Sequence, residues 1–202
     1  MARLKWRTSG TPWWAVALCA GLLVSASCSD TVRQGRSPAY LVVDAMEATP
    51  SGGTTFTNVL DSDVLTKGSV LEDQGRVTMH LQVKNLDIPA TPTNAITVNR
   101  YHVSFRRADG QNAPGVHVPY AFDGAVTGTI TEDGKKVSLV FILVRVQAKL
   151  EPPLSPLVGQ GGELAILTIA DVTFYGRDQT GNDVSVTGSI TVNFADWADP
   201  SS

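Results

Sequence analysis

Residues 184–194, VSVTGSITVNF, alternate apolar and polar side chains from end to end. Successive side chains of a β-strand point to opposite faces, so this pattern predicts a strand with one buried face and one solvated face. Gly188 falls on the apolar side of the stretch. Residues 77–83, VTMHLQV, repeat the pattern, with His80 on the polar side. These two stretches make β structure the basis of the fold.

Similar patterns recur along the rest of the chain. We expect further strands at residues 40–46, 96–107, 116–120, 126–130, 137–150 and 164–174, with a weaker pattern at 54–60 and a turn or short helical piece within 61–73. In 96–107 the apolar parity changes between Val98 and Tyr101, which predicts a β-bulge near Asn99 and Arg100. Residues 137–150 begin almost entirely apolar, so we expect a central strand buried on both faces at one end.

The spacing of turn residues predicts how these strands connect. Turn-forming groups occur at residues 108–110, 132–134 and 178–182, and no long window has the 3.6-residue period of a helix. The pattern predicts an all-β fold, an antiparallel sandwich of about eight or nine strands. We expect residues 39–202 to form this single domain.

The first 27 residues have the pattern of an export signal. Arg3, Lys5 and Arg7 supply positive charge without an acidic residue, and an apolar run over residues 13–24 follows. This run is shorter than the about 20 apolar residues that a membrane-spanning helix needs. We therefore expect a signal peptide over residues 1–27 that is removed.

Residues 24–28, VSASC, resemble the lipobox of bacterial lipoprotein precursors. The resemblance implies that Cys28 becomes the lipidated first residue of the mature protein. In similar proteins an Asp after the Cys retains the product at the inner membrane, so Ser29 implies the outer membrane. Ser25 and Ser27 also suit an ordinary secretory cleavage, which would release a soluble protein.

Processing at Cys28 would fix the properties of the mature chain. Residues 28–38 are largely polar, as expected of a tether between lipid and domain. Cys19 would be removed, so one mature chain would have neither a disulfide nor a Cys-based metal site. Loss of the three signal-peptide cations leaves 13 basic against 19 acidic residues, a net charge of about −6, which argues against nucleic acid or anionic lipid as the main partner.

Residues 178–182, DQTGN, lie between two strong strand patterns. They resemble the last hairpin of bacterial immunoglobulin-like domains, over residues 171–189, and this resemblance implies an immunoglobulin-like sandwich. Asp178 is expected to cap the turn, while Gly181 and Asn182 accept positive φ. The Cys and Trp markers of antibody domains are absent, because Trp197 follows the last predicted strand.

Candidate chemical groups are scattered. Strand parity predicts that His80, His102 and His117 lie at the surface. No two of them have the i, i+2 or i, i+4 spacing that would favour a zinc site. The acidic residues Asp61, Asp63, Asp109, Glu132, Asp133, Asp178 and Asp183 are expected in turns, where they either form the turns or bind calcium.

The remaining candidates have ordinary explanations. Arg106-Arg107 and Lys135-Lys136 are expected to be solvated charges, and Trp197 a plug over the open end of the core rather than a sugar-stacking platform. No motif for nucleophilic catalysis or phosphate binding occurs. We expect no catalytic residue, metal or cofactor.

Three functional hypotheses follow. The first is a non-catalytic, lipid-anchored envelope protein that presents loops to another envelope or extracellular component. The second is an exported hydrolase or carbohydrate-binding domain with its site in long loops, and the third is a polymerising structural subunit. For the first two, the loops at residues 85–95 and 151–162 are expected to lie at the same end and form the binding surface.

Overall fold

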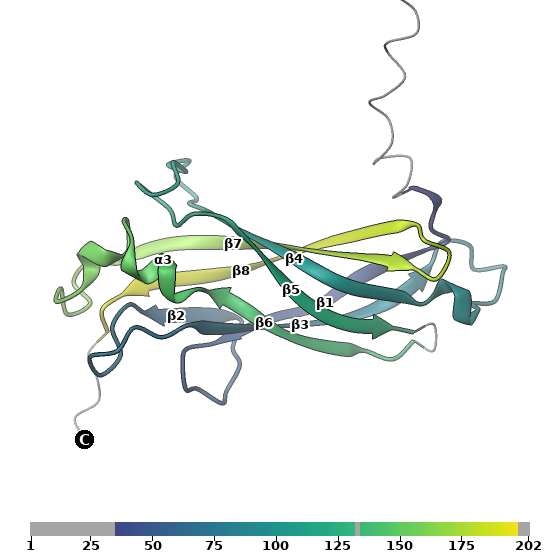
Figure 1. Cartoon of the computed structure of the whole chain (residues 1–202), viewed down its shortest axis with the longest axis horizontal. Helices are drawn as coiled ribbons and strands as arrows, with labels where there is room; N and C mark the ends of the chain where they lie inside the picture. Colours follow the sequence, from purple (N-terminus) through teal and green to yellow (C-terminus); the bar gives the residue numbers. More distant parts are fainter. Residues whose placement is uncertain (1–34, 132–133, 198–202) are drawn as a thin grey trace, which may run out of the picture.

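Strands make up most of the computed structural model, which describes residues 35–131 and 134–197 (Figure 1). The strands are β1 (Ala39–Thr49), β2 (Val59–Asp63), β3 (Asp73–Val83), β4 (Ile96–Arg106), β5 (Phe122–Ile130), β6 (Val137–Val144), β7 (Ile166–Asp178) and β8 (Asp183–Ala195). The short helical segments are η1 (Pro92–Asn94), α3 (Val146–Leu150) and η2 (Ser155–Leu157). The predicted signal segment and Cys28 lie outside the described residues.

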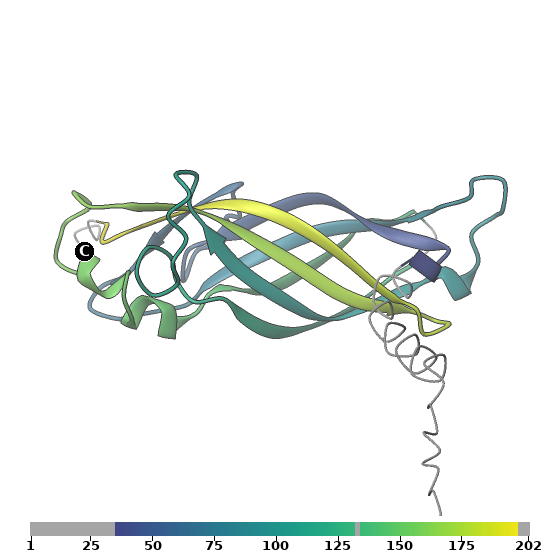
Figure 2. The same cartoon turned by 90° about the horizontal axis from the view of Figure 1, so that it is seen from above.

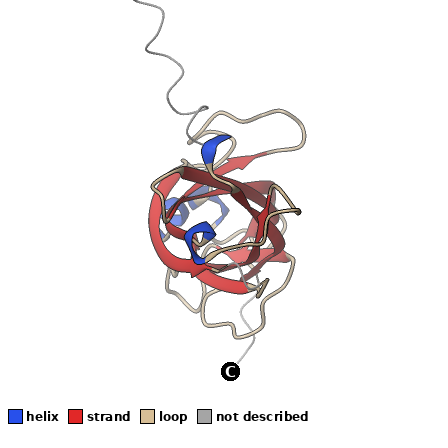
Figure 3. Cartoon of the chain, turned by 90° about the vertical axis from the view of Figure 1, so that its right-hand side faces the viewer, coloured by secondary structure: helices blue, strands red, loops and turns tan. Residues whose placement is uncertain are grey.

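The strands form two sheets that enclose one core. One sheet has the order β1-β3-β6, and the other has the order β2-β8-β7-β4-β5. Seen along the long axis, the two sheets surround a common interior (Figure 3). The buried apolar side chains form one cluster. The predicted all-β, sandwich-like arrangement is confirmed, with eight strands in the described part of the chain. The pairing is antiparallel throughout except between β2 and β8, which run parallel.

Side-chain alternation explains the core. In β3, Val77 and Met79 are fully buried, whereas Thr78 and His80 are only half-buried. β8 follows the same rule, and Gly188 on its inward side leaves room for Met46, whose Cγ would lie 2.7 Å from an added Cβ. The predicted inward and outward faces of both stretches are confirmed.

The predicted bulge is present in β4. From Val98 to Tyr101 the chain of β4 advances three residues, whereas its partner β7 advances only two, from Gly176 to Phe174. On the other side, β5 advances four residues, from Gly128 to Gly124. The bulge changes the inward parity, so Tyr101 can join the aromatic core, with its ring centroid 5.1 Å from that of Phe141.

Residues 137–150 differ from the predicted central strand. β6 ends at Val144 and pairs only with β3, so it is an edge strand, and its Val140 is exposed. Leu139 and Leu143 point inward, and a continuing strand would bring Arg145, Gln147 and Lys149 into the same inward phase. The chain instead turns into α3.

Two further segments were predicted incorrectly. Residues 116–120 form a turn rather than a strand, with the N–H groups of Val116, His117 and Val118 directed at the carbonyl of Ala113. The pattern at 54–60 becomes β2 only from Val59 onward, and the strand continues to Asp63. Residues 61–73 otherwise form turns and extended chain, without a helix.

The strand directions define two ends of the sandwich (Figures 1 and 2). The N-terminal end is where β1 begins, and it holds residues 35–38, the loop 84–95 and the hairpin 178–183. The distal end holds the loops 50–58, 64–72, 107–121 and 145–165.

The expectation that loops 85–95 and 151–162 share one end is wrong. Val83, before the first loop, pairs with Ala39, whereas Val144, before the second, pairs with Asp73 at the opposite end of β3. The physical reason is the missing strand at 116–120, since one strand fewer reverses the direction of every strand that follows.

Candidate functional site

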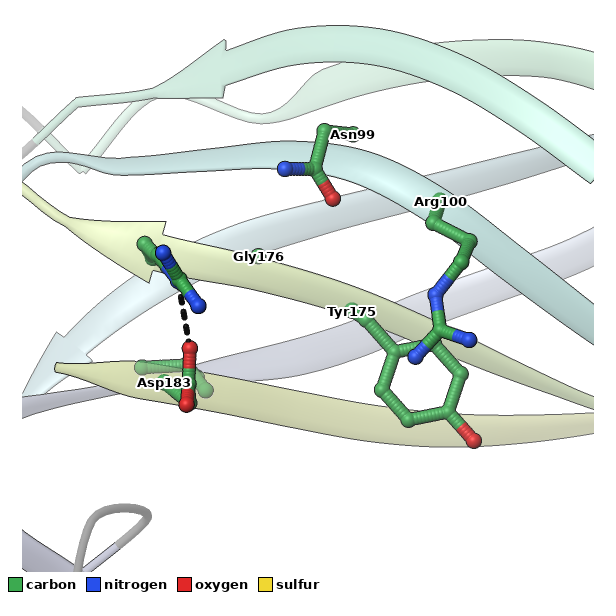
Figure 4. Close-up of a pocket in the computed structure, with 7 residues that line it drawn as sticks. Asn99, Arg100, Tyr175, Gly176 and Asp183 are labelled. Carbon is green, nitrogen blue, oxygen red and sulfur yellow. Dashed lines mark hydrogen bonds and ion pairs between the residues drawn. The ribbon is translucent and has the colours of Figure 1, made fainter. Parts of the chain in front are cut away.

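A hollow of about 460 Å³ lies on the outer face of the five-stranded sheet, beside the β4 bulge (Figure 4). Its lining residues are Asn99, Arg100, Tyr175, Gly176, Arg177, Asp183 and Val184. A Cβ on Gly176 would approach the Thr97 carbonyl oxygen to 2.5 Å, so the close backbone approach at the floor of the hollow requires glycine. Two of the lining residues, Asn99 and Arg100, lie at the bulge itself.

The charges around the hollow are already matched. The Arg100 guanidinium lies 4.1 Å from the centroid of the Tyr175 ring, and its Nη1 is 3.5 Å from Asp123 Oδ1. Arg177 Nε donates to Asp183 Oδ1 at 2.6 Å. Arg100 covers the aromatic face that a sugar ring would stack upon (Figure 4). The hollow thus offers a polar, charge-neutralised surface rather than a nucleophile with a base beside it.

The histidines do not converge. His80 on β3 contacts Asp44 at 2.7 Å, and His102 on β4 contacts Asp123 at 3.3 Å, while His117 lies in the distal loop 107–121. The His80 contact, followed by Lys136, lowers the pKa of the Asp44 carboxyl. Across residues 35–131 and 134–197, no three His, Cys, Asp or Glu side chains are grouped to hold a metal ion.

Only some of the acidic residues that were expected in turns lie in turns. Asp61 and Asp63 lie in β2, and Asp63 accepts hydrogen bonds from Thr66 Oγ1 and from the Trp197 N–H. Asp109 does lie in a turn, where the Arg107 guanidinium lowers its pKa to about 2. Glu132 and Asp133 are outside the described residues.

The hairpin at Asp178 follows the predicted capping logic. Asp178 Oδ1 accepts hydrogen bonds from the N–H groups of Thr180 and Asn182, and its Oδ2 accepts one from Asn182 Nδ2. Burial alone would raise its pKa, but hydrogen bonds from Asn182 and Thr180 lower it to about 2. Gly181 has a φ of +88°, as expected. Asn182 does not adopt positive φ, and its amide bonds to Asp178 instead.

The paired cations form surface ion pairs. Arg106 contacts Asp171 at 2.6 Å, Arg107 contacts Asp109 at 2.6 Å, and Lys136 contacts Asp44 at 3.0 Å. Each pair is partly solvated, and such pairs contribute little to stability. They behave as the solvated charges expected from the sequence.

Sequence reasoning missed a buried ion pair beneath the distal end. Lys149 and Asp73 are each 1% exposed, and Lys149 Nζ lies 2.9 Å from Asp73 Oδ2. Nζ also donates to the carbonyl of Asp63 at 2.8 Å, and Ser62 Oγ donates to Asp73 at 2.6 Å. Burial raises the pKa of the Asp73 carboxyl, and the neighbouring Lys149 opposes that rise.

This ion pair joins three elements of the fold. Ser62 and Asp63 come from β2, Asp73 begins β3, and Lys149 comes from α3. The network therefore fixes α3, the first part of the loop 145–165, against β2 and β3. A lysine among Arg145 and Gln147 gave no sequence signal of burial, because its partner is distant in the chain.

The distal end carries most of the large exposed apolar side chains. They are Leu71, Val116, Tyr120, Leu150, Val158, Leu164, Leu167 and Trp197. Trp197 lies against Gly162, whose added Cβ would be 3.5 Å from Trp197 Cε3, and it stays 37% exposed. Trp197 thus covers part of the distal end and also contributes to its surface.

Comparisons with known proteins find only weak structural similarity. No protein-family model and no curated protein matches the chain. One similar solved structure is Northeast Structural Genomics Consortium target SoR45, at 13% identity and a TM-score of 0.31, over 78% of this chain and 86% of that one. Another is Spo0M, a sporulation control protein from Bacillus subtilis, at 15% identity and a TM-score of 0.31, over 77% of this chain and 49% of that one. Neither similarity is strong enough to support an argument about function.

Proposed function

We propose that this chain is a non-catalytic, lipid-anchored protein of the bacterial cell envelope, which presents its distal end to another envelope or extracellular component. The observation that carries the proposal is the polarity of the domain. The described chain enters β1 at one end, and the longest loops, with most of the exposed apolar side chains, lie at the other.

The anchor is proposed from the N-terminal sequence. The signal pattern ends at Cys28, and residues 28–38 would connect a lipid to β1. An anchor at this position would hold the N-terminal end toward the bilayer, with the distal end facing away. Ser29 favours the outer membrane. Within the described residues, no helix has the length and hydrophobicity to cross a bilayer.

The distal end has properties suited to binding a partner. Exposed aliphatic and aromatic side chains are concentrated at this end, and interaction surfaces on many proteins are rich in such side chains. Beneath them, Leu154 and Leu157 are buried, and Lys149 is bonded to Asp73, so the loop 145–165 is held in place. A loop that is ordered before binding loses less conformational entropy when a partner docks.

A non-catalytic role is supported by how the ionisable groups are used. Asp44, Asp123, Asp171 and Asp183 each contact a cation or a histidine on the outer faces of the sheets. These contacts engage each of the four carboxylates in a surface ion pair.

The anchor is tested by mass spectrometry of the protein isolated from bacterial membranes. We expect an acylated N-terminal peptide beginning at Cys28, and release of Cys28→Ser from the membrane. Recovery of a soluble chain that begins at an unmodified residue would overturn the lipid anchor.

The binding surface is tested by photo-crosslinking in intact cells. A crosslinking residue at Leu164 should capture one envelope component, whereas the same residue at Thr187, exposed on the outer face of β8, should capture none. Val116→Glu together with Leu167→Glu should abolish the Leu164 crosslink. Equal capture from Leu164 and Thr187 would contradict a distal binding surface.

A further inference from the structure

The loop 84–91 has an apolar tip that no other part of the described chain covers. Leu86 is 79% exposed, the largest exposed fraction of any large apolar side chain among the described residues. Ile88 is 60% exposed, also among the highest. Asp87 separates them, and its N–H bonds to Asn85 Oδ1 at 3.0 Å in a tight turn. The turn thus presents two aliphatic side chains on either side of one carboxylate.

Both ends of this loop are fixed to the sandwich. The Lys84 N–H donates to the Pro38 carbonyl at 2.9 Å, and Lys84 Nζ donates to the Gly35 carbonyl at 3.2 Å. At the other side, the Thr91 N–H donates to Asn94 Oδ1 at 2.7 Å as the chain turns into η1. The loop therefore projects in a defined direction, beyond the ends of the strands (Figures 1 and 2).

The position of the loop relates it to the proposed anchor. Gly35, which accepts the Lys84 bond, is seven positions after Cys28 in the sequence. At about 3.3–3.6 Å per residue, a fully extended segment of that length spans at most about 25 Å. A lipid on Cys28 would thus keep the N-terminal end, and this loop with it, close to the bilayer surface.

We propose that Leu86 and Ile88 insert into the lipid bilayer and orient the domain on the membrane. This proposal rests on the lipid anchor of the proposed function. The aliphatic side chains would enter the boundary between headgroups and acyl chains, while Asp87 and Lys84 stay at headgroup level. Insertion is therefore shallow, as for other interfacial anchors.

A bilayer fits this loop better than a protein does. A stable protein interface usually buries about 800 Å² on each partner, far more than two side chains on one turn supply. A lipid on Cys28 would attach the domain to the membrane at one point, and a second contact would fix its orientation. An apolar loop beside the tether provides such a contact with no need for a matching surface.

The test attaches the protein to vesicles independently of cellular lipidation. The chain from residue 28 onward contains Cys28 as its only cysteine and Trp197 as its only tryptophan, and the described core lies wholly within it. Cys28 is coupled to a maleimide lipid in phosphatidylcholine vesicles that carry brominated acyl chains. In a Trp197→Phe background, Leu86→Trp reports on the loop, and the unsubstituted Trp197 of the parent protein reports on the distal end.

We expect the tryptophan at position 86 to lose most of its emission to the brominated lipid, while Trp197 keeps its own. With Ile88→Trp as the reporter, adding Leu86→Asp should abolish the quenching. Emission at position 86 as strong as that of Trp197 would overturn insertion and leave a protein partner as the occupant of the loop. The maleimide lipid replaces the natural anchor, so the two proposals are tested separately. If protein isolated from cells carries no acyl group on Cys28, the natural lipid anchor is refuted. If the tryptophan at position 86 is not quenched in the vesicles, the insertion of the loop is refuted.

Discussion

Lys149 shows how one charged side chain can organise a whole end of the molecule. Its Nζ contacts Asp73 and the Asp63 carbonyl, and the side chains of Lys149, Asp73 and Ser62 are all buried. Burying two charges costs several kcal/mol per ion, so such a pair is tolerated only with good geometry and additional hydrogen bonds. Ser62 and the Ser51 N–H supply those bonds to Asp73. The network fixes the position of α3 against β2 and β3.

Lys149→Met should lower the free energy of unfolding by about 3–5 kcal/mol, because it leaves a buried carboxylate unpaired. Removal of Lys149 lets burial raise the pKa of Asp73 further. A raised folded-state pKa means that the protonated folded form is favoured. The loss of stability should therefore be full at pH values above that pKa and should shrink as the pH falls through it. Chemical denaturation at several pH values measures this.

Lys136→Met is the matched control for the buried lysine. Lys136 is 64% exposed and pairs with Asp44 at the surface, so its loss should cost about 1 kcal/mol or less. Equal losses for the two variants would show that the Lys149 network does not stabilise the fold.

Asp178→Ala should destabilise the protein by about 1–3 kcal/mol, because the hairpin loses the acceptor for several hydrogen bonds. The folded-state pKa of Asp178 is about 2, below the about 3.9 of an unfolded aspartate. Its contribution is therefore present above about pH 4 and is lost as the pH falls toward 2. The difference between the parent and Asp178→Ala in urea unfolding should narrow over that window.

Asp178→Asn separates geometry from charge in the same hairpin. An amide keeps one acceptor oxygen but does not titrate, so this variant should retain part of the stability without the acid dependence. If the stability of Asp178→Asn falls with pH as steeply as that of the parent protein, the pH dependence comes from a group other than Asp178.

At the scale of strands, the sequence predicted what alternation alone controls. The inward faces of β3 and β8 and the β4 bulge followed from apolar parity. The end of the strand within residues 137–150 could not be predicted, because the apolar and polar alternation continues past Val144. The sequence also does not reveal that Lys149 is buried, since its partner Asp73 is far away in the chain. Residues 116–120 failed because a short apolar run in a turn resembles a strand. The hollow beside Asn99 could not be predicted, because its position depends on the register of β4 with β5 and β7. That register is set by strand pairing, which the sequence alone does not reveal.

The two faces of β3 should respond differently to truncation. Leu81→Ala should cost about 2–5 kcal/mol, because it leaves a cavity in the core. His80→Ala should cost about 1 kcal/mol or less, since it removes only a partly exposed contact with Asp44. Thermal and chemical denaturation measure both. Comparable losses would mean that the strand faces are assigned wrongly.

At the scale of the whole molecule, the sheet edges lie against one another. β1, at an edge of the smaller sheet, lies beside β8 and β2, and β5 lies beside β6. Strands in these positions have less room to accept a strand from another molecule. This arrangement disfavours a polymerising subunit.

The chain from residue 29 onward should therefore stay monomeric at high concentration. Analytical ultracentrifugation over a wide concentration range would measure its sedimentation coefficient, which should not change. Concentration-dependent growth in size would revive polymerisation through a sheet edge. A variant with Val140→Lys, which places a charge on exposed β6, is the control, since it should then block the growth.

The parallel pairing of β2 with β8 has a consequence for the order in which the protein can be made and assembled. Asp61 and Asn193 are neighbours in the sheet but lie 132 positions apart in the chain. β8 also sits between β2 and β7, so the larger sheet has a gap until the last strand is synthesised. Contacts between such distant segments form late. A nascent chain of this topology cannot complete the five-stranded sheet until β8 has left the ribosome. This delay would suit the proposed export, since an unfolded chain is the form that can pass through a narrow translocation channel.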